Sequence, residues 1–201
     1  MHWKTINKLI GNIDLYWLDF ILKGNLEDDA KILDAGCGEG RNLFYCMQTG
    51  YDVFGVDQNP EAIMFLKLMA KQFNVTDIDA RFQVMDLAKL RFPDESFDVI
   101  INSAVLHFAE SQTHFMQMLS ECVRVLKPDG KLFMRTMADK GLDNSGENNI
   151  ADNKKRFLLN ENLLQHFYNI YGLEFLEIPK YVVVGNVRTM GTFAFKKIKN
   201  G

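Results

Sequence analysis

The sequence predicts an α/β fold: a doubly wound, mostly parallel seven-stranded sheet with an antiparallel last strand and helices on both faces. Short apolar runs alternate with segments of helical periodicity, which is the order that builds a parallel sheet. The early runs are apolar at consecutive positions, as expected for strands buried on both faces. The last two runs are joined by a segment without a helical pattern, so the final strand is expected to reverse direction.

Seven apolar runs are the predicted strands. In chain order they are Lys31–Asp34, Asp52–Val56, Ala80–Met85, Phe97–Asn102, Gly130–Met137, Leu173–Ile178 and Gly191–Lys197. Before the fifth run, Lys127-Pro128-Asp129-Gly130 is a turn signal that should end a helix and open the strand.

Five segments, one before the first run and four between runs, are predicted helices. They are Asp14–Leu22, Leu43–Met47, Asn59–Phe73, Ser111–Leu126 and Asn160–Phe167. The third has the clearest start, because Asn59 suits an N-cap and Pro60 suits the first helical position. The first belongs to an expected N-terminal helical cap over residues 1–25.

Length and composition limit the possible functions. The 201 residues are enough for one domain, so residues 1–201 are interpreted as a single domain. A net charge of −3 argues against bulk nucleic acid as a partner. Three scattered cysteines indicate a reducing compartment and predict no metal site. Without a signal-peptide pattern or an apolar run near ~18 residues, we expect a cytoplasmic monomer or homodimer with no membrane partner.

Residues Lys31–Asn42 are the most informative stretch for function. They read Lys-Ile-Leu-Asp-Ala-Gly-Cys-Gly-Glu-Gly-Arg-Asn, so an apolar run ends in Asp34 and glycines occupy alternate positions 36, 38 and 40. Glycine is needed where the backbone turns tightly or lies against a ligand. At a strand-to-helix turn, this arrangement makes a crevice with free backbone N–H groups at the helix start. Such a crevice suits a nucleotide-like cofactor.

The glycine spacing separates two cofactor classes. A dinucleotide fingerprint has glycines at its first, third and sixth positions, and the sixth position here is Arg41. The spacing Gly36-x-Gly38-x-Gly40, with Asp34 two residues before it, resembles the first motif of class I S-adenosylmethionine (SAM) dependent methyltransferases. A plain glycine-rich turn is the alternative. The resemblance implies a Rossmann-like fold whose last strand is reversed, as the strand pattern also predicts.

Two further acids follow predicted strands. Asp57 lies at the end of the second strand, about 20 residues past the glycine turn, where a carboxylate can accept two hydrogen bonds from a ribose diol. The alternative for Asp57 is helix capping. In the resembled family, an acid after the third strand faces the adenine amino group. Asp86 matches that position, and the N–H of Leu87 would address a ring nitrogen, whereas a solvent-exposed loop is the alternative for Asp86.

Two longer segments extend the resemblance over nearly the whole chain. Leu90–Phe108 looks like the fourth-strand signature of the small-molecule branch, and Leu126–Leu132 looks like that family's entry into the fifth strand. By resemblance, the glycines would approach the methionine part of SAM, Asp34 its ammonium group, Asp57 the ribose and Asp86 the adenine. The complete set of expected cofactor contacts is Asp34, Gly36, Cys37, Gly38, Gly40, Asn42, Asp57, Gln58, Asp86, Leu87, Asn102 and Ser103.

The acceptor side is expected beyond the fourth strand, where Asn102, Ser103 and His107 are candidates. His107 titrates near neutral pH and would act as a base or orient the substrate, although packing against the following helix is the alternative. Arg135, Arg188 and Lys180 lie in segments that could edge the acceptor pocket, as an anionic substrate would require. The polar segment 139–155 is expected near the site, as a lid or as a bland loop.

The leading hypothesis is therefore SAM-dependent methylation of a small molecule, with S-adenosylhomocysteine as product. An NAD-dependent oxidoreductase is the first alternative, and Arg41 and Asp86 argue against it. A SAM sensor or pseudoenzyme that binds without turnover is the second. Methylation of RNA or protein is a third, but the sequence shows neither a basic patch nor a recognition domain.

Overall fold

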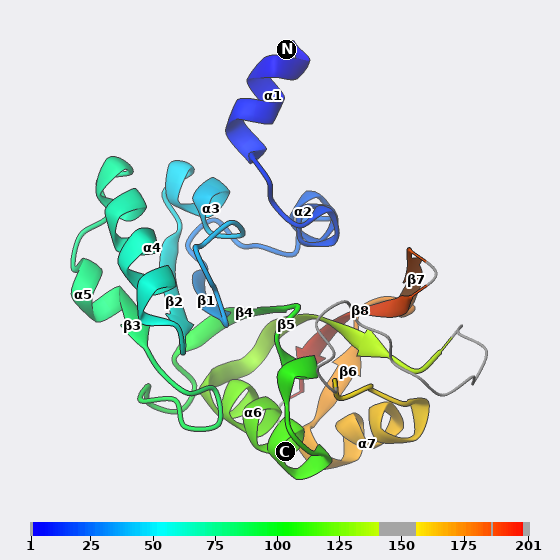
Figure 1. Ribbon diagram of the computed structural model, residues 1–201. Coiled ribbons are helices and arrows are strands. Elements are labelled where there is room, and N and C mark those ends of the chain that lie inside the picture. The colour runs from blue at the N-terminus through cyan, green and yellow to red at the C-terminus, as the bar shows by residue number, and fades with distance from the viewer. Residues whose placement is uncertain (1, 141–155, 186, 199–201) are drawn as a thin grey trace.

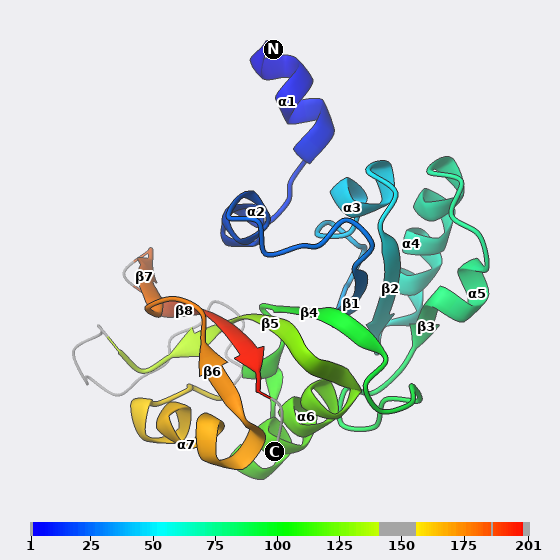
Figure 2. The same ribbon diagram turned by 180° about the vertical axis from the view of Figure 1, so that it is seen from behind.

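The computed structural model describes residues 2–140, 156–185 and 187–198. They form one eight-stranded sheet with helices on both faces (Figures 1 and 2). The strands are β1 (Lys31–Ala35), β2 (Asp52–Asp57), β3 (Phe82–Val84), β4 (Phe97–Ser103), β5 (Leu126–Ala138), β6 (Leu173–Phe175), β7 (Lys180–Val184) and β8 (Arg188–Lys197). The helices are α1 (Trp3–Ile10), α2 (Leu15–Leu22), α3 (Phe44–Gln48), α4 (Pro60–Gln72), α5 (Ile78–Arg81), the 3₁₀ helix η1 (Leu106–Phe108), α6 (Gln112–Val125) and α7 (Glu161–Tyr171).

The strand order confirms the predicted fold class. It is β3-β2-β1-β4-β5-β8-β6, with β7 also paired to β8. Strands β1 to β5 pair in parallel, whereas β8 is antiparallel to β5, β6 and β7. The chain runs outward from β1 to β3 and then returns to β4 on the other side of β1. Such a reversal leaves a crevice at the carboxyl ends of β1 and β4.

Several predicted boundaries need correction. The third strand begins at Phe82, because Ala80 and Arg81 belong to the short helix α5. Strand β6 ends at Phe175, and the following residues lead into β7, which the strand pattern did not predict. Strand β7 forms a hairpin with β8, and two of its valines are exposed. It therefore lacks the continuous buried apolar run by which the other strands were predicted.

The turn signal before the fifth strand is a bulge inside that strand. Helix α6 ends at Val125, one residue before the predicted end at Leu126, and β5 starts at Leu126 rather than after the turn. The pairing with β4 jumps from Phe97–Leu126 to Val99–Lys131. Asp129 takes φ 63° within the jump. The extra residues are therefore extruded without ending the strand.

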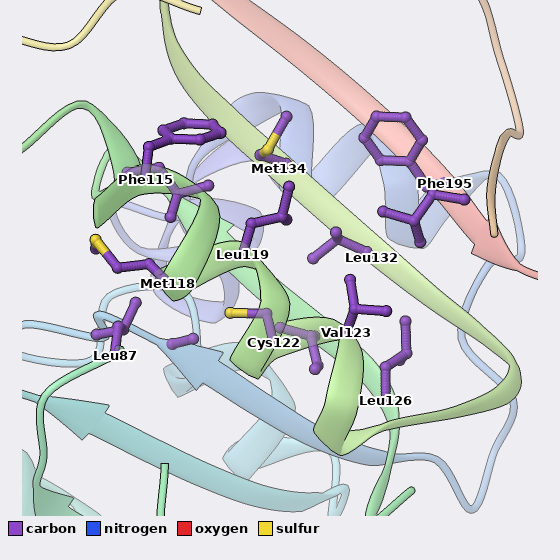
Figure 3. Packing of buried hydrophobic residues seen from close by; sticks show 14 of the residues in the cluster. Leu87, Phe115, Met118, Leu119, Cys122, Val123, Leu126, Leu132, Met134 and Phe195 are labelled. Carbon is purple, nitrogen blue, oxygen red and sulfur yellow. The ribbon is translucent and has the colours of Figure 1, made fainter. Parts of the chain in front are cut away.

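The core lies on both faces of the sheet. On one face, the buried Trp17 and Phe20 of α2 stack with ring centroids 5.2 Å apart and contact Phe133 of β5. On the other face, the apolar side of α6 packs against Leu132 and Met134 of β5, as Figure 3 shows. The residues on this apolar side of α6 are buried; they are Phe115, Met118, Leu119, Cys122 and Val123.

The N-terminal segment covers the sheet only in part. Helix α2 starts at the predicted place, because the Asp14 side chain accepts the backbone N–H groups of Tyr16 and Trp17. Helix α1 has no buried residue, its Trp3 is 65% exposed, and it projects away from the sheet in both views (Figures 1 and 2). None of the described helices is long and apolar enough to cross a membrane. From residue 141 on, the predicted polar loop lies outside the described residues.

Candidate functional site

A cavity of about 490 Å³ lies at the carboxyl ends of β1, β2, β3 and β4. Nine of the predicted cofactor residues line it: Gly36, Cys37, Gly38, Asn42, Asp57, Gln58, Asp86, Leu87 and Ser103. The lining also includes Asn12, Glu39, Arg41, Ala104, Val105, Phe108, His114 and Met118. The reversal of strand order between β1 and β4 therefore places the glycine turn and the acids of β2 and β3 around one cavity.

Gly36 makes the tightest approach in the glycine turn. Its φ is +89°, and a Cβ built there would lie 2.4 Å from Cγ2 of Val105, on the loop after β4. Gly38 also has a positive φ, +52°, but a Cβ there would have no neighbour within 4 Å. Glycine at 36 is therefore needed for packing within the cavity wall, whereas position 38 faces open space.

The backbone N–H groups of the turn are used inside the protein. Those of Gly36 and Cys37 donate to the carbonyl of Val56 at 2.8 and 2.9 Å, and that of Gly38 donates to Oδ2 of Asp57 at 2.9 Å. Helix α3 begins only at Phe44. The expectation of free N–H groups is therefore corrected for residues 36–38, whose donors are already paired and hold the turn in a fixed shape.

Gly40 does not line the cavity. A Cβ at this position would lie 2.4 Å from Cδ1 of Leu66 in α4. The absence of a side chain at Gly40 therefore lets α4 pack closely against the turn, and a cofactor contact at this position stays a prediction. The spacing of glycines along a chain does not reveal which way each missing Cβ would point.

Asp57 lines the cavity and also makes local hydrogen bonds, whereas its ribose role stays a prediction. Oδ1 accepts the N–H of Asn59 at 2.9 Å, and Oδ2 accepts that of Gly38 at the same distance. The carboxylate therefore ties the glycine turn to the start of α4, whose N-cap is Asn59. Because each carboxylate oxygen can accept more than one hydrogen bond, capacity remains for a ligand in the cavity.

Asp86 and Leu87 lie at the β3 side of the cavity. Oδ1 of Asp86 accepts the N–H of Ala88 at 2.9 Å, and this local turn orients the carboxylate. From α6, Met118 and His114 also line the cavity. Neither residue is among the cofactor contacts expected from the sequence. Met118 is buried on α6 and also reaches the cavity wall.

Asp34 is buried beneath the turn and does not line the cavity. It is 1% exposed, and both carboxylate oxygens lack a hydrogen-bond partner among the described residues. Burial raises the pKa of Asp34 to about 7, and the positive charge of Arg41 opposes this rise. Because Asp34 does not line the cavity, its expected support of a cofactor ammonium group, directly or through water, stays a prediction.

The buried Asp34 predicts a specific pH dependence of stability. Its pKa rises on folding from an ordinary value of 3.8, so its stabilising contribution is present below about pH 4 and is lost as pH rises through about 7. Asp34→Asn removes this titration at nearly constant size. We expect the stability of the variant relative to the native chain to increase from about pH 4 to about pH 7. Urea unfolding across this range tests it, and parallel pH profiles would contradict it.

A buried carboxylate that the sequence pattern missed joins the N-terminal segment to the site. Oδ2 of Asp14 accepts Nη1 of Arg135 at 3.0 Å, the hydroxyl of Ser103 at 3.3 Å and Nη2 of Arg41 at 3.4 Å. The Asp14 N–H donates to Oδ1 of Asn42 at 3.1 Å. Asn42 and Ser103 thus line the cavity and also hold Asp14. The only local signal at Asp14 was its place before a helix.

Asn102 and His107 lie beside the cavity and do not line it. Nδ2 of Asn102 donates to the carbonyl of Ala35 at 3.2 Å, which joins the ends of β4 and β1. His107, in η1, is 7% exposed. Burial lowers its pKa to about 4, and the charges of Arg156, Arg188 and Arg135 lower it further, so its imidazole is neutral at pH 7. A catalytic role for His107 stays a prediction.

Comparison with known proteins gives a consistent picture. A family model described as a methyltransferase domain matches residues 33–134. Arsenite methyltransferase from Aquipseudomonas alcaligenes is 32% identical over 126 residues, which cover 58% of this chain and 36% of that protein. Phosphoethanolamine N-methyltransferase 1 from Arabidopsis thaliana is 33% identical over 119 residues, covering 58% of this chain and 23% of that protein. The match thus spans about a third or less of these relatives.

Solved structures share the fold over most of the chain. A SAM-dependent methyltransferase from Methanosarcina mazei superposes with a TM-score of 0.69 at 20% identity, covering 90% of this chain and 98% of that one. Magnesium protoporphyrin IX methyltransferase from Synechocystis, solved with bound S-adenosylhomocysteine, gives 0.72 at 18% identity, covering 94% and 83%. At these identities the likeness establishes the sheet and its helices.

Proposed function

Because this chain belongs to the methyltransferase domain family, we propose that it transfers the methyl group of SAM to a small-molecule acceptor. The observation that carries the proposal is the cavity bounded by the glycine turn, Asp57 and Asp86. Its volume, about 490 Å³, is in the range of cofactor and small-ligand sites. The two carboxylates come from different strand ends, as acceptors for a ribose diol and an adenine amino group would.

When bound, SAM supplies an activated methyl group on its sulfonium. The chain has to hold this group in line with a nucleophile and keep water out. In this proposal, Asp57 holds the ribose, Asp86 and Leu87 hold the adenine, and the open side of Gly38 admits the methionine part. The lining from the end of β4, Ser103 and Ala104, faces the acceptor.

Several features support a small acceptor. The two relatives described above carry names that specify small acceptors, arsenite and phosphoethanolamine. The net charge of −3 offers no general attraction to nucleic acid.

A cytoplasmic location, a monomeric or homodimeric state and a single domain over residues 1–201 belong to the same proposal.

Calorimetric titration with S-adenosylhomocysteine, with NADH in parallel, tests the cofactor. We expect micromolar binding of the former and none of the latter. Binding of NADH alone would support the oxidoreductase alternative and overturn the proposal. Transfer of a labelled methyl group from SAM to members of an acceptor panel then separates an enzyme from a SAM sensor, because a sensor would bind without turnover.

Asp57→Ala should weaken binding of S-adenosylhomocysteine by roughly 1–3 kcal/mol, since ribose hydroxyls would lose their acceptor. The variant also releases the N–H groups of Gly38 and Asn59, so the glycine turn loses its tie to α4. Asp28→Ala is the control, because it removes an exposed carboxylate outside the cavity lining. Equal calorimetric affinities for the two variants would remove Asp57 from the ribose site.

A further inference from the structure

One face of the sheet carries two arginines near the end of β5. Arg135 of β5 is paired with Thr192 of β8, and Met137 with Met190. Directly paired residues share a face of an antiparallel sheet, and so do residues two apart on one strand. Arg188, two residues before Met190, therefore lies on the same face as Arg135. Along β8, Arg188 and Thr192 are about 13 Å apart.

This face is the one that α2 covers, and it borders the cavity. The guanidinium carbon of Arg135 lies 5.2 Å from the centre of the Tyr16 ring in α2. Through Asp14, Arg135 is linked to Ser103, which lines the cavity. Between the two arginines, Met137 and Met190 pack with Ala104, another lining residue.

A third arginine lies at the rim. The guanidinium carbon of Arg156 stacks 4.5 Å from the ring centre of Phe108, which lines the cavity and is exposed. The neighbouring His107 experiences the charges of all three arginines, Arg156, Arg188 and Arg135, which each lower its pKa. The charges of all three arginines therefore act on His107, although the arginines come from separate segments and are not among the residues that line the cavity.

Among the described residues of this rim, three arginines (Arg41, Arg135 and Arg188) outnumber two carboxylates, Asp14 and Asp139, the latter following the Ala138–Thr189 pair and so lying beside Arg188. The carboxylate of Asp14 is shared by Arg135 and Arg41. Arg188 is exposed, and within the described residues no carboxylate forms an ion pair with it. Because the sulfonium of the proposed cofactor is also cationic, this region would repel a cationic acceptor and attract an anionic one.

We infer that the methyl acceptor carries a carboxylate or phosphate group, which Arg188 and Arg135 hold on the η1 side of the cavity. Arginine suits this role because its planar fork can make two parallel hydrogen bonds to an oxyanion. The inference rests on the proposed function, since an acceptor exists only if the chain transfers a methyl group.

The test compares an anion with its neutral analogue. Benzoate and benzamide are titrated into protein with and without saturating S-adenosylhomocysteine, and the imidazole signals of ¹³C-labelled histidine are followed by NMR. His107→Gln identifies the His107 signal. We expect benzoate to shift this signal saturably at millimolar concentration, and benzamide to bind about tenfold more weakly or not at all.

Arg188→Gln should weaken benzoate binding about fivefold and change affinity for S-adenosylhomocysteine by less than about twofold. Lys71→Gln, which removes one charge from the exposed side of α4 at its far end, should change neither. Equal binding of benzoate and benzamide, or equal benzoate affinity in the two variants, would overturn the inference. If the native chain did not bind S-adenosylhomocysteine, the proposed cofactor would be overturned instead. The two failures can be told apart, because the titration without S-adenosylhomocysteine still measures binding of the anion.

Discussion

Asp14→Ala should lower the free energy of unfolding by about 3 kcal/mol. About 1 kcal/mol comes from loss of the N-cap of α2. The rest comes from leaving Arg135 without its carboxylate, because breaking a buried ion pair leaves an uncompensated charge. The Asp14 side chain is 3% exposed and that of Arg135 is 18% exposed, so water can replace the lost partner only in part. Urea unfolding monitored by circular dichroism measures the change.

Asp14→Asn is the matched control, because asparagine can still cap the helix but carries no charge. We expect it to retain the capping contribution and lose most of the ion-pair contribution, so its stability should fall between those of the native chain and the alanine variant. A loss below about 1 kcal/mol in Asp14→Ala would mean that the contacts of Asp14 with Arg135 and Ser103 add nothing to a simple cap.

Gly36→Ala is expected to be about as destabilising, by about 3 kcal/mol. The new Cβ would meet Val105 at 2.4 Å, and crowding of this kind typically lowers stability by ~1–3 kcal/mol. A φ of +89° is also strained for alanine, which adds ~1–3 kcal/mol in unfavourable cases. The cavity wall would have to shift, so affinity for S-adenosylhomocysteine should fall as well. Thermal unfolding and calorimetry measure the two effects.

Two other variants separate crowding from backbone strain. Gly38→Ala has φ +52° and open space around its Cβ, so it should lose only ~1 kcal/mol. Val105→Ala removes the methyl groups that crowd position 36, and the double variant with Gly36→Ala should be more stable than the two single losses predict. If Gly36→Ala and Gly38→Ala were equally destabilised, the close approach to Val105 would not explain why position 36 requires glycine.

Most of the fold could be predicted because its signals are local. The buried strands near the centre of the sheet are continuous apolar runs, and caps such as Asn59 and Ser111 mark helix starts. Strand β7 was missed because it is a partly exposed hairpin strand and lacks a continuous buried run. The bulge in β5 reads locally as a turn, and only the pairing with β4 distinguishes the two.

The site could be predicted only where the signal is local. Asp57 and Asp86 follow strand ends, and parallel strands bring such ends to one edge, so both line the cavity. Asp14 was missed because its partners Ser103 and Arg135 lie far along the chain. Asp34 and Gly40 do not line the cavity, because a motif gives position along the chain and does not tell which side chains face the cavity.

Strand β8 pairs with β5 on one side and with β6 and β7 on the other, although it is made late. During translation, the backbone edge of β5 from Lys131 to Ala138 stays unpaired until β8 has been synthesised. Unpaired strand edges recruit strands of other molecules, and pairing between distant segments is slow. The nascent chain is therefore most exposed to aggregation in the interval between synthesis of β5 and synthesis of β8, when a chaperone would have the most to protect.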